Sequence, residues 1–329
     1  MKAWILVVVP PLVAGGPPLP ARFDPLPVAG QRGPGPASHL LFDARLGRPV
    51  LLVPSRATGR ESLWELVDGT WRLVTDSGPP ARELGAAAFD LARGRLVLHG
   101  GMGLGNREDR RDDTWEWDRT AWRRAADVGP GPRDHHAMVF DEARGRVVMV
   151  GGADRNDSLA TEVWEWDGER WHRVVPPLPG PGGRAHFALA YDAVRRQVVL
   201  FGGMGQGYRV HGDTWAWDGR AWRELSQTGP PRRSHHRMTF DRQAGVVVLF
   251  GGLRTGRPAE PLGDTWRWDG TRWTQVDGPG PSPRSGHVMV HDPVTARTLL
   301  YGGGAFDGRV STGFRDTWSW SRGRWLQVE

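Results

Sequence analysis

Short apolar segments alternate with turn residues along most of the chain, and residues 132–174 contain one complete period. The apolar segments there predict strands over residues 136–140, 146–150, 162–166 and 171–174. Asp141 ends the first segment, Gly151-Gly152 ends the second, and Asp167-Gly168 separates the third from the fourth. Strands of about five residues bounded by turn residues predict an antiparallel meander of four strands.

Tryptophans mark the same places in six successive repeats. The chain has 18 tryptophans, and all but Trp4 belong to this pattern. The leading tryptophans recur every 49 to 52 residues, at Trp64, Trp115, Trp164, Trp215, Trp266 and Trp318. A second tryptophan follows each of them by seven residues, at Trp71, Trp122, Trp171, Trp222, Trp273 and Trp325. Because Trp117 and Trp122 flank a four-residue loop, we expect them to face each other across a hairpin.

The six repeats predict one closed domain, because an isolated meander leaves both of its faces exposed. Six meanders in a ring bury those faces against their neighbours. The sequence therefore predicts an all-β fold, a six-bladed β-propeller of four-stranded antiparallel blades. The predicted blades cover residues 36–76, 77–127, 128–176, 177–227, 228–278 and 279–329.

The N-terminal residues lie outside this pattern. They read MKAWILVVVPPLVAGG, with one lysine, a short apolar run and small residues, which is typical of a secretory signal peptide. The run is too short to span a bilayer, so no stable membrane span is expected. The alternative is an additional edge strand of the propeller, which the prolines after the run disfavour. We expect a signal peptide over residues 1–16, a Pro/Gly-rich linker over 17–35, and a secreted or periplasmic protein; otherwise the protein would be cytoplasmic.

Composition narrows the possible functions. The chain has no cysteine, which excludes disulfides, thiol catalysis and cysteine metal sites. The net charge is +6 and the pI is about 10.6, but arginines and acids are interleaved and form no basic block. A nucleic-acid partner is therefore not expected. No dinucleotide-binding or phosphate-binding glycine motif is visible, so we expect no cofactor.

The repeats resemble the kelch-type β-propeller, including its version in the central domain of galactose oxidase. The resemblance covers about 290 residues and rests on Arg-x-x-His, an apolar strand, a Gly-Gly pair and the tryptophan hairpin. The pairs are Gly100-Gly101, Gly151-Gly152, Gly202-Gly203, Gly251-Gly252 and Gly302-Gly303. The chain differs from the usual kelch repeat by placing tryptophan in strand three, and the first repeat has Pro54-Ser55 instead of Gly-Gly. The resemblance implies that strand one is innermost. No exchanged closing strand is required, unless residues 20–30 provide one.

Loops of two kinds separate the predicted strands. Those after strands one and three are short and uniform, whereas those after strand two are long and varied. The loops after strands two and four emerge on one face, which we call the loop-rich face. Binding sites usually lie on varied loops supported by a rigid scaffold, so we place the candidate site there, near the mouth of the central channel.

One arginine precedes strand one in each of repeats two to six. The five are Arg82, Arg133, Arg184, Arg233 and Arg284. They could form an anion site. Alternatively, they form structural ion pairs with the acids that precede the first tryptophan, which are Asp113, Glu162, Asp213, Asp264 and Asp316. Repeat one has Gly35 and Ser62 at these positions, so it lacks the arginine and the acid together. The loss of both partners in one repeat favours the ion pairs over the anion site.

Histidines cluster at the same end of the repeats. His136, His236 and His287 match the kelch Arg-x-x-His, and the resemblance implies a structural role for them. The preceding position is occupied by His135, His186 and His235, which should face the opposite way. These three are candidates for binding or for acid–base chemistry. No carboxylate accompanies them at fixed spacing, so a metal site is not expected. The loop after strand two of repeat four adds the candidates Tyr208, Arg209 and His211.

Resemblance to kelch enzymes gives an alternative to binding. Copper radical oxidases need a cysteine–tyrosine cross-link, which this chain cannot form. Plant specifier proteins bind iron through the motif Glu-x3-Asp-x3-His. Its nearest match in this chain is Glu108, Asp112 and Glu116, which has glutamate in place of the histidine. Bacterial sialic acid epimerases are six-bladed kelch proteins. We therefore expect a monomeric, non-enzymatic recognition module for a protein or glycan, with an anionic-sugar epimerase or mutarotase as the alternative.

Overall fold

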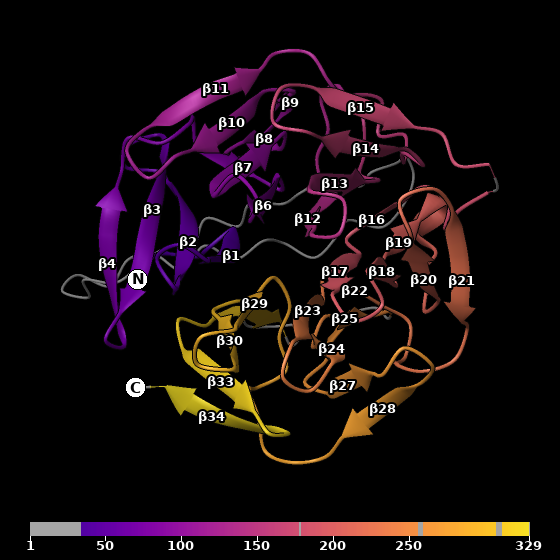
Figure 1. The fold of residues 1–329 in the computed structure, drawn as a ribbon. Coiled ribbons are helices and arrows are strands. Elements are labelled where there is room, and N and C mark those ends of the chain that lie inside the picture. The colour runs from indigo at the N-terminus through magenta and orange to yellow at the C-terminus, as the bar shows by residue number, and fades with distance from the viewer. Residues whose placement is uncertain (1–33, 178, 256–258, 307–310, 329) are drawn as a thin grey trace.

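The computed structural model describes residues 34–177, 179–255, 259–306 and 311–328. The signal-peptide prediction, most of the linker and the possible closing strand over residues 20–30 therefore lie outside the described residues. Those described form six four-stranded antiparallel sheets, arranged in a ring (Figure 1). Each sheet runs in chain order from strand one to strand four, which confirms the predicted all-β propeller.

We number the sheets as blades one to six. Blade one contains β1 (His39–Asp43), β2 (Arg48–Ser55), β3 (Arg60–Val67) and β4 (Thr70–Thr75). Blade two contains β6 (Ala86–Asp90), β7 (Arg95–His99), β10 (Thr114–Trp117) and β11 (Trp122–Ala126). Blade three contains β12 (Ala137–Asp141), β13 (Arg146–Val150), β14 (Val163–Trp166) and β15 (Trp171–Val174). Blade four contains β17 (Ala188–Asp192), β18 (Gln197–Phe201), β20 (Thr214–Trp217) and β21 (Trp222–Ser226). Blade five contains β23 (Arg237–Asp241), β24 (Val246–Phe250), β27 (Thr265–Trp268) and β28 (Trp273–Val276). Blade six contains β29 (Val288–Asp292), β30 (Arg297–Tyr301), β33 (Thr317–Ser321) and β34 (Arg324–Val328).

The first strands of the blades surround the central axis. Each packs against the first strand of the next blade, and β29 contacts β1, so the ring closes between blades six and one. The expectation that strand one is innermost is confirmed (Figure 1). The predicted strands of blade three agree with the structure to within one residue: strand one begins at Ala137 rather than His136, and strand three at Val163 rather than Glu162.

The tryptophan hairpins fill the space between blades. Trp117 lies directly opposite Trp122, as expected, with 5.7 Å between the ring centroids. Trp166 and Trp171 repeat this pair at 5.5 Å, and Trp166 is fully buried. All six leading tryptophans lie in strand three, where the sequence pattern places them. Blades that diverge from an axis need large side chains at their outer strands, and these rings supply that volume.

Hydrogen bonds from strand-four tryptophans also join neighbouring blades. The indole Nε1 of Trp171 donates to the Thr114 hydroxyl of blade two at 2.8 Å. Trp273 makes the same 2.8 Å bond to Thr214 of blade four. Blade three has Val163 at the threonine position, and the buried Nε1 of Trp222 has no hydrogen-bond partner among the described residues.

The Gly-Gly pairs have a steric cause. Gly100 has a φ of 62°, and a Cβ there would lie 2.9 Å from the ring of His136 in the next blade. Gly151 has the same conformation, and its Cβ would lie 2.9 Å from the ring of Phe187. Phenylalanine and histidine therefore occupy equivalent places, which shows that an aromatic ring is sufficient there. This packing agrees with a structural role for His136.

Small additional sheets, which the sequence pattern does not reveal, cover the loop-rich face. In blades two, four and five they pair the arginine segment before strand one with residues just after Gly-Gly. In blade six the strands Gly304–Phe306 and Ser311–Gly313 pair with each other, and the arginine segment joins them through the single bridge Ser285–Gly304. Their strands are β5 (Arg82–Glu83), β8 (Met102–Gly103), β9 (Asn106–Arg110), β16 (Arg184–Ala185), β19 (Met204–Gly205), β22 (Arg233–Ser234), β25 (Leu253–Arg254), β26 (Glu260–Pro261), β31 (Gly304–Phe306) and β32 (Ser311–Gly313). One short 3₁₀ turn, η1, covers Gln206–Tyr208. These sheets hold the long loops against the blades and so shape the mouth of the channel.

Candidate functional site: the mouth of the central channel

Five arginines form the same buried ion pair in blades two to six. Arg184 donates from Nη1 and Nη2 to the carboxylate of Asp213, at 2.8 and 3.1 Å. Its Nη1 also donates to the carbonyl oxygen of Gly202, at 2.9 Å. Trp215 donates its Nε1 to the same carboxylate at 2.8 Å. Arginine, acid, glycine carbonyl and tryptophan thus form one repeated unit.

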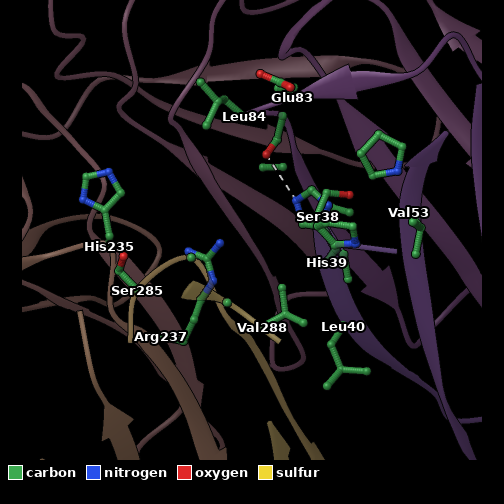
Figure 2. Close-up of a pocket in the computed structure, with 18 of the residues that line it drawn as sticks. Ser38, His39, Leu40, Val53, Glu83, Leu84, His235, Arg237, Ser285 and Val288 are labelled. Carbon is green, nitrogen blue, oxygen red and sulfur yellow. Dashed lines mark hydrogen bonds between the residues drawn. The ribbon is translucent and has the colours of Figure 1, made fainter. Parts of the chain in front are cut away.

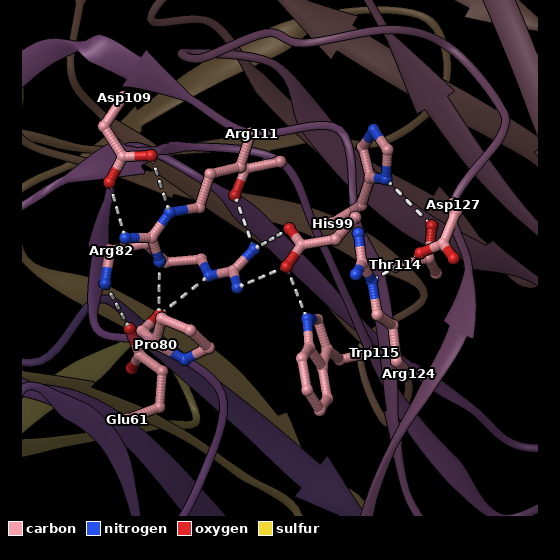
Figure 3. A network of polar contacts seen from close by, with 12 residues as sticks. Glu61, Pro80, Arg82, His99, Asp109, Arg111, Thr114, Trp115, Arg124 and Asp127 are labelled. Atoms are coloured by element: carbon pink, nitrogen blue, oxygen red, sulfur yellow. Dashed lines mark hydrogen bonds and ion pairs between the residues drawn. The ribbon is translucent and has the colours of Figure 1, made fainter.

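The other blades build this unit with closely similar distances. The shortest arginine–acid contacts are 2.7 Å for Arg82–Asp113, 3.1 Å for Arg133–Glu162, 2.7 Å for Arg233–Asp264 and 2.6 Å for Arg284–Asp316. Figure 3 shows the Arg82 network, in which Asp109 and Arg111 extend the contacts of blade two. The predicted ion pairs are therefore confirmed. The arginines are buried, and their guanidinium groups are directed at these carboxylates.

The ion pairs change the titration of their acids. Burial alone would raise the pKa of Asp213, but the hydrogen bonds and charge of Arg184, with the Trp215 bond, lower it below the usual range. The pKa of Asp264 is lowered in the same way by its contacts with Arg233 and Trp266. A carboxylate with a lowered pKa stabilises the fold above its unfolded pKa of about 3.9. That contribution is lost as the pH falls through the folded pKa.

Blade one lacks the ion pair but keeps part of the hydrogen-bond pattern. Gly35 replaces the arginine and Ser62 replaces the acid. The Ser62 hydroxyl accepts from Trp64 Nε1 at 3.1 Å and donates to the carbonyl oxygen of Val53 at 2.9 Å. Ser62 therefore accepts the tryptophan hydrogen bond that the acid accepts in the other blades, but it carries no negative charge.

A cavity of about 660 Å³ lies at the axis of the ring and opens towards the loop-rich face. Its wall includes the start of every innermost strand together with loops of the described residues. Figure 2 shows His39, Glu83, His235, Arg237 and Ser285 around it. This volume is within the range of cavities that bind small molecules or the ends of larger ligands.

Three predicted histidines meet at this mouth. The ring centroids of His135 and His186 are 4.0 Å apart, and those of His186 and His235 are 3.8 Å apart and stacked. All three have a positive φ of 56° to 58°, which turns their side chains away from those of the following residues. The backbone N–H of His235 donates to the carbonyl oxygen of His186 at 2.9 Å, linking two blades. The three lie on the cavity wall, which His136 also lines, and they precede the strands, so their direction follows from the positive φ and not from the strand alternation assumed in the sequence analysis.

Asp134 fixes the first of these histidines. The Nδ1 of His135 lies 2.6 Å from Oδ1 of Asp134, and Arg110 donates to the other oxygen at 2.7 Å. Burial would raise the pKa of Asp134, but His135 and Arg110 lower it to about 2. The carboxylate is therefore ionised at neutral pH and holds the His135 ring in one orientation.

Charged side chains line the same cavity. Among its described lining residues are three arginines, Arg56, Arg237 and Arg315, and one glutamate, Glu83. Arg56 lies 3.6 Å from the Glu83 carboxylate, so these two charges balance. Arg237 and Arg315 add two further guanidinium groups to the described part of the wall.

Arg237 was missed by the sequence analysis, although the repeats contain a signal for it. It is the first residue of β23, where the other blades have His39, Ala86, Ala137, Ala188 and Val288. A charged residue at a position that is otherwise mostly small or apolar marks blade five as different. Its importance depends on the cavity, which no single repeat reveals.

The other three candidates lie apart from the histidines. Tyr208 packs against Ala153, Ala185, Met204 and Val210, and Arg209 is exposed. His211 is half-buried beside Arg184; burial and the charge of Arg184 lower its pKa. None of Tyr208, Arg209 and His211 is among the residues that line the cavity. The structure therefore does not bring them together with His135, His186 and His235.

The kelch histidines are neutral. Complete burial, followed by the charges of nearby residues, lowers the pKa of His136, His236 and His287 well below the usual value.

Among the residues that the structure describes, no group of three or more histidine, aspartate or glutamate side chains is arranged to hold a metal ion. The same residues include no helix that is long and apolar enough to cross a membrane.

Comparisons with known proteins agree with this architecture. The family model described as the KLHDC2/KLHL20/DRC7 Kelch-repeats domain matches residues 144–328, more than half of the chain. The chain therefore belongs to the kelch-repeat family. The solved structure of YjhT is similar, with a TM-score of 0.69 and 14% identity over 91% of this chain and 99% of that one. At this identity the likeness concerns the fold alone. No curated protein matches the sequence.

Proposed function

We propose that this protein is a recognition module that binds a carboxylate-bearing protein or glycan at the channel mouth on the loop-rich face. Kelch-repeat propellers are in general binding modules, and the proposal adds the face and the chemistry of the ligand. A rigid ring of blades supports the site, so little conformational entropy would be lost on binding.

The observation that carries the proposal is the position of Arg237. Its side chain lies in a cavity wall whose charges, in the described residues, are those of three arginines and one glutamate. Arg56 lies near that glutamate, Glu83, and a carboxylate entering from the loop-rich face would meet the guanidinium groups of Arg237 and Arg315 in the wall. Guanidinium groups bind carboxylates through two parallel hydrogen bonds, which are among the stronger contacts available to a protein. The five arginines of the ion pairs are buried against their own acids and supply none of this charge.

Binding of acidic glycans and acidic peptides, presented as two arrays, tests the proposal. We expect the wild-type protein to retain carboxylate-bearing members of one array in preference to their neutral analogues. Arg237→Gln should weaken that binding about 10- to 100-fold, the loss typical of one charged hydrogen-bonding partner. Arg272→Gln is the matched control, because it removes the same charge from an exposed turn of blade five on the opposite face. Equal binding by both variants would contradict the proposal.

The same cavity also supports the alternative, an epimerase or mutarotase acting on an anionic sugar. Its wall holds an oriented His135 and the carboxylate of Glu83, which are groups that can transfer protons. Exchange spectroscopy of bound acidic sugars distinguishes the two functions. Accelerated interconversion of anomers or epimers that is lost in His135→Gln would favour the enzyme, whereas binding without interconversion favours the recognition module.

A further inference from the structure

In the part of the chain that the structure describes, the central cavity extends outwards along one blade only. Among its described lining residues, those from strand three are Ser62 and Trp64 of blade one. The equivalent tryptophans and acids of blades two to six do not line it. The cavity therefore has a radial extension, which we call the blade-one slot and define by Gly35, Val53, Pro54, Ser62 and Trp64.

The slot occupies the place that an arginine fills in every other blade. Counting back eight residues from the aspartate that ends strand one gives Arg184 in blade four and Gly35 in blade one. The Arg184 guanidinium fills the space between Asp213 and the carbonyl oxygen of Gly202. A Cβ on Gly35 would lie 3.5 Å from Cγ1 of Val53, so a side chain at this position would start at the slot wall.

The chemistry of the slot differs from that of an arginine site. Ser62 stands where the other blades have an acid, so the negative charge that would balance a guanidinium is missing. Its hydroxyl already donates to Val53 and accepts from Trp64. The remaining wall consists of Val53, Pro54 and part of the Trp64 ring. Such a wall suits an uncharged group with apolar surface and disfavours a cation.

We infer that the blade-one slot is a second subsite, which takes an uncharged, largely apolar group of the same ligand whose carboxylate lies at the channel mouth. The carboxylate part of this inference rests on the proposed function. The slot itself follows from blade one alone and can be tested without any charged ligand. Because the slot is continuous with the mouth, one ligand can occupy both places.

Small probes separate the two subsites. Phenylacetate carries both groups, acetate carries only the carboxylate, and benzyl alcohol carries only the uncharged ring. Binding is followed by NMR titration of ¹⁵N-labelled protein, in which Trp64→Phe identifies the indole N–H resonance of Trp64. We expect benzyl alcohol and phenylacetate to shift this resonance in the wild type, and phenylacetate to bind at least about 10-fold more tightly than acetate.

Restoring the pattern of the other blades should close the slot. Gly35→Arg combined with Ser62→Asp rebuilds the arginine–acid pair, so we expect a melting temperature no lower than that of the wild type. Phenylacetate should then bind no better than acetate, while the affinity for acetate is retained. If this variant does not fold, Gly35→Leu fills the slot with an apolar side chain and should give the same loss.

Each outcome bears on one part of the account. A Trp64 resonance that benzyl alcohol leaves unchanged in the wild type, or equal affinities for phenylacetate and acetate, would overturn the slot. Retained phenylacetate preference after the slot is filled would also overturn it. In Arg237→Gln, benzyl alcohol should still shift the Trp64 resonance while acetate binding is lost. If acetate binding is instead unaffected by Arg237→Gln, the proposed carboxylate site fails and the slot stands.

Discussion

The Arg184–Asp213 pair gives the most direct test of how the ring is stabilised. The side chain of Arg184 is 1% exposed and that of Asp213 is 18% exposed. Removing one partner of a buried ion pair typically costs about 3–5 kcal/mol, because the other charge is left buried. Since the carboxylate retains some solvent contact and the Trp215 bond, we expect Arg184→Ala to lower the free energy of unfolding by about 3 kcal/mol.

A double-mutant cycle measured by denaturant unfolding checks this value. Asp213→Ala should also destabilise the protein, and the double variant should lose about 1–3 kcal/mol less than the sum of the single losses. The matched control is the exposed pair of Arg254 and Glu260, whose side chains are 51% and 57% exposed. Its removal should cost less than about 1 kcal/mol. Additive losses for Arg184 and Asp213, or a gain in stability from Arg184→Ala, would refute the reasoning.

Three further predictions concern packing, pH and export. Thr214→Val should lower the free energy of unfolding, measured with denaturant, by about 1 kcal/mol, because it leaves the indole N–H of Trp273 without a hydrogen-bond acceptor. Val163 already leaves Trp222 in that state in the native protein. An unchanged denaturation midpoint would count against this interblade bond. His136 stays neutral when buried, whereas in the unfolded chain the same imidazole binds a proton below about pH 6.5. The contribution of His136 to the free energy of unfolding therefore falls by about 2 kcal/mol between neutral pH and pH 5. His136→Phe should reduce this loss in pH-dependent unfolding, and an unchanged pH slope would contradict the assignment. Mass spectrometry of the protein secreted by its native host should find a new N-terminus between residues 13 and 20, and an intact N-terminus would argue against the signal peptide.

The repeats made much of the fold predictable from the sequence. Strand boundaries followed from turn residues that each repeat carries locally, and the Trp117–Trp122 contact followed from loop length. The ion pairs could be predicted because both partners recur, and because Gly35 and Ser62 change together. In each case the information lies within one repeat or in a comparison of repeats.

The site was only partly predictable, since it depends on how the blades meet. His186 and His235 are 49 residues apart, and their stacking requires the curvature of the ring and a positive φ, which is uncommon for residues other than glycine. Arg237 becomes significant only because it lies in the cavity wall. The exposed position of Arg209 depends on the fold of one irregular loop, which no repeated pattern specifies.

The most direct test of the central claim is an NMR map of where a ligand binds. The ligand is the carboxylate-bearing glycan or peptide that the wild-type protein retains most tightly on the two arrays. Its titration should shift resonances of His186, His235 and Arg237 at the channel mouth and leave those of the opposite turns, such as Arg272, unchanged. Shifts confined to the turns after strands one and three, with the channel mouth unaffected, would contradict the account.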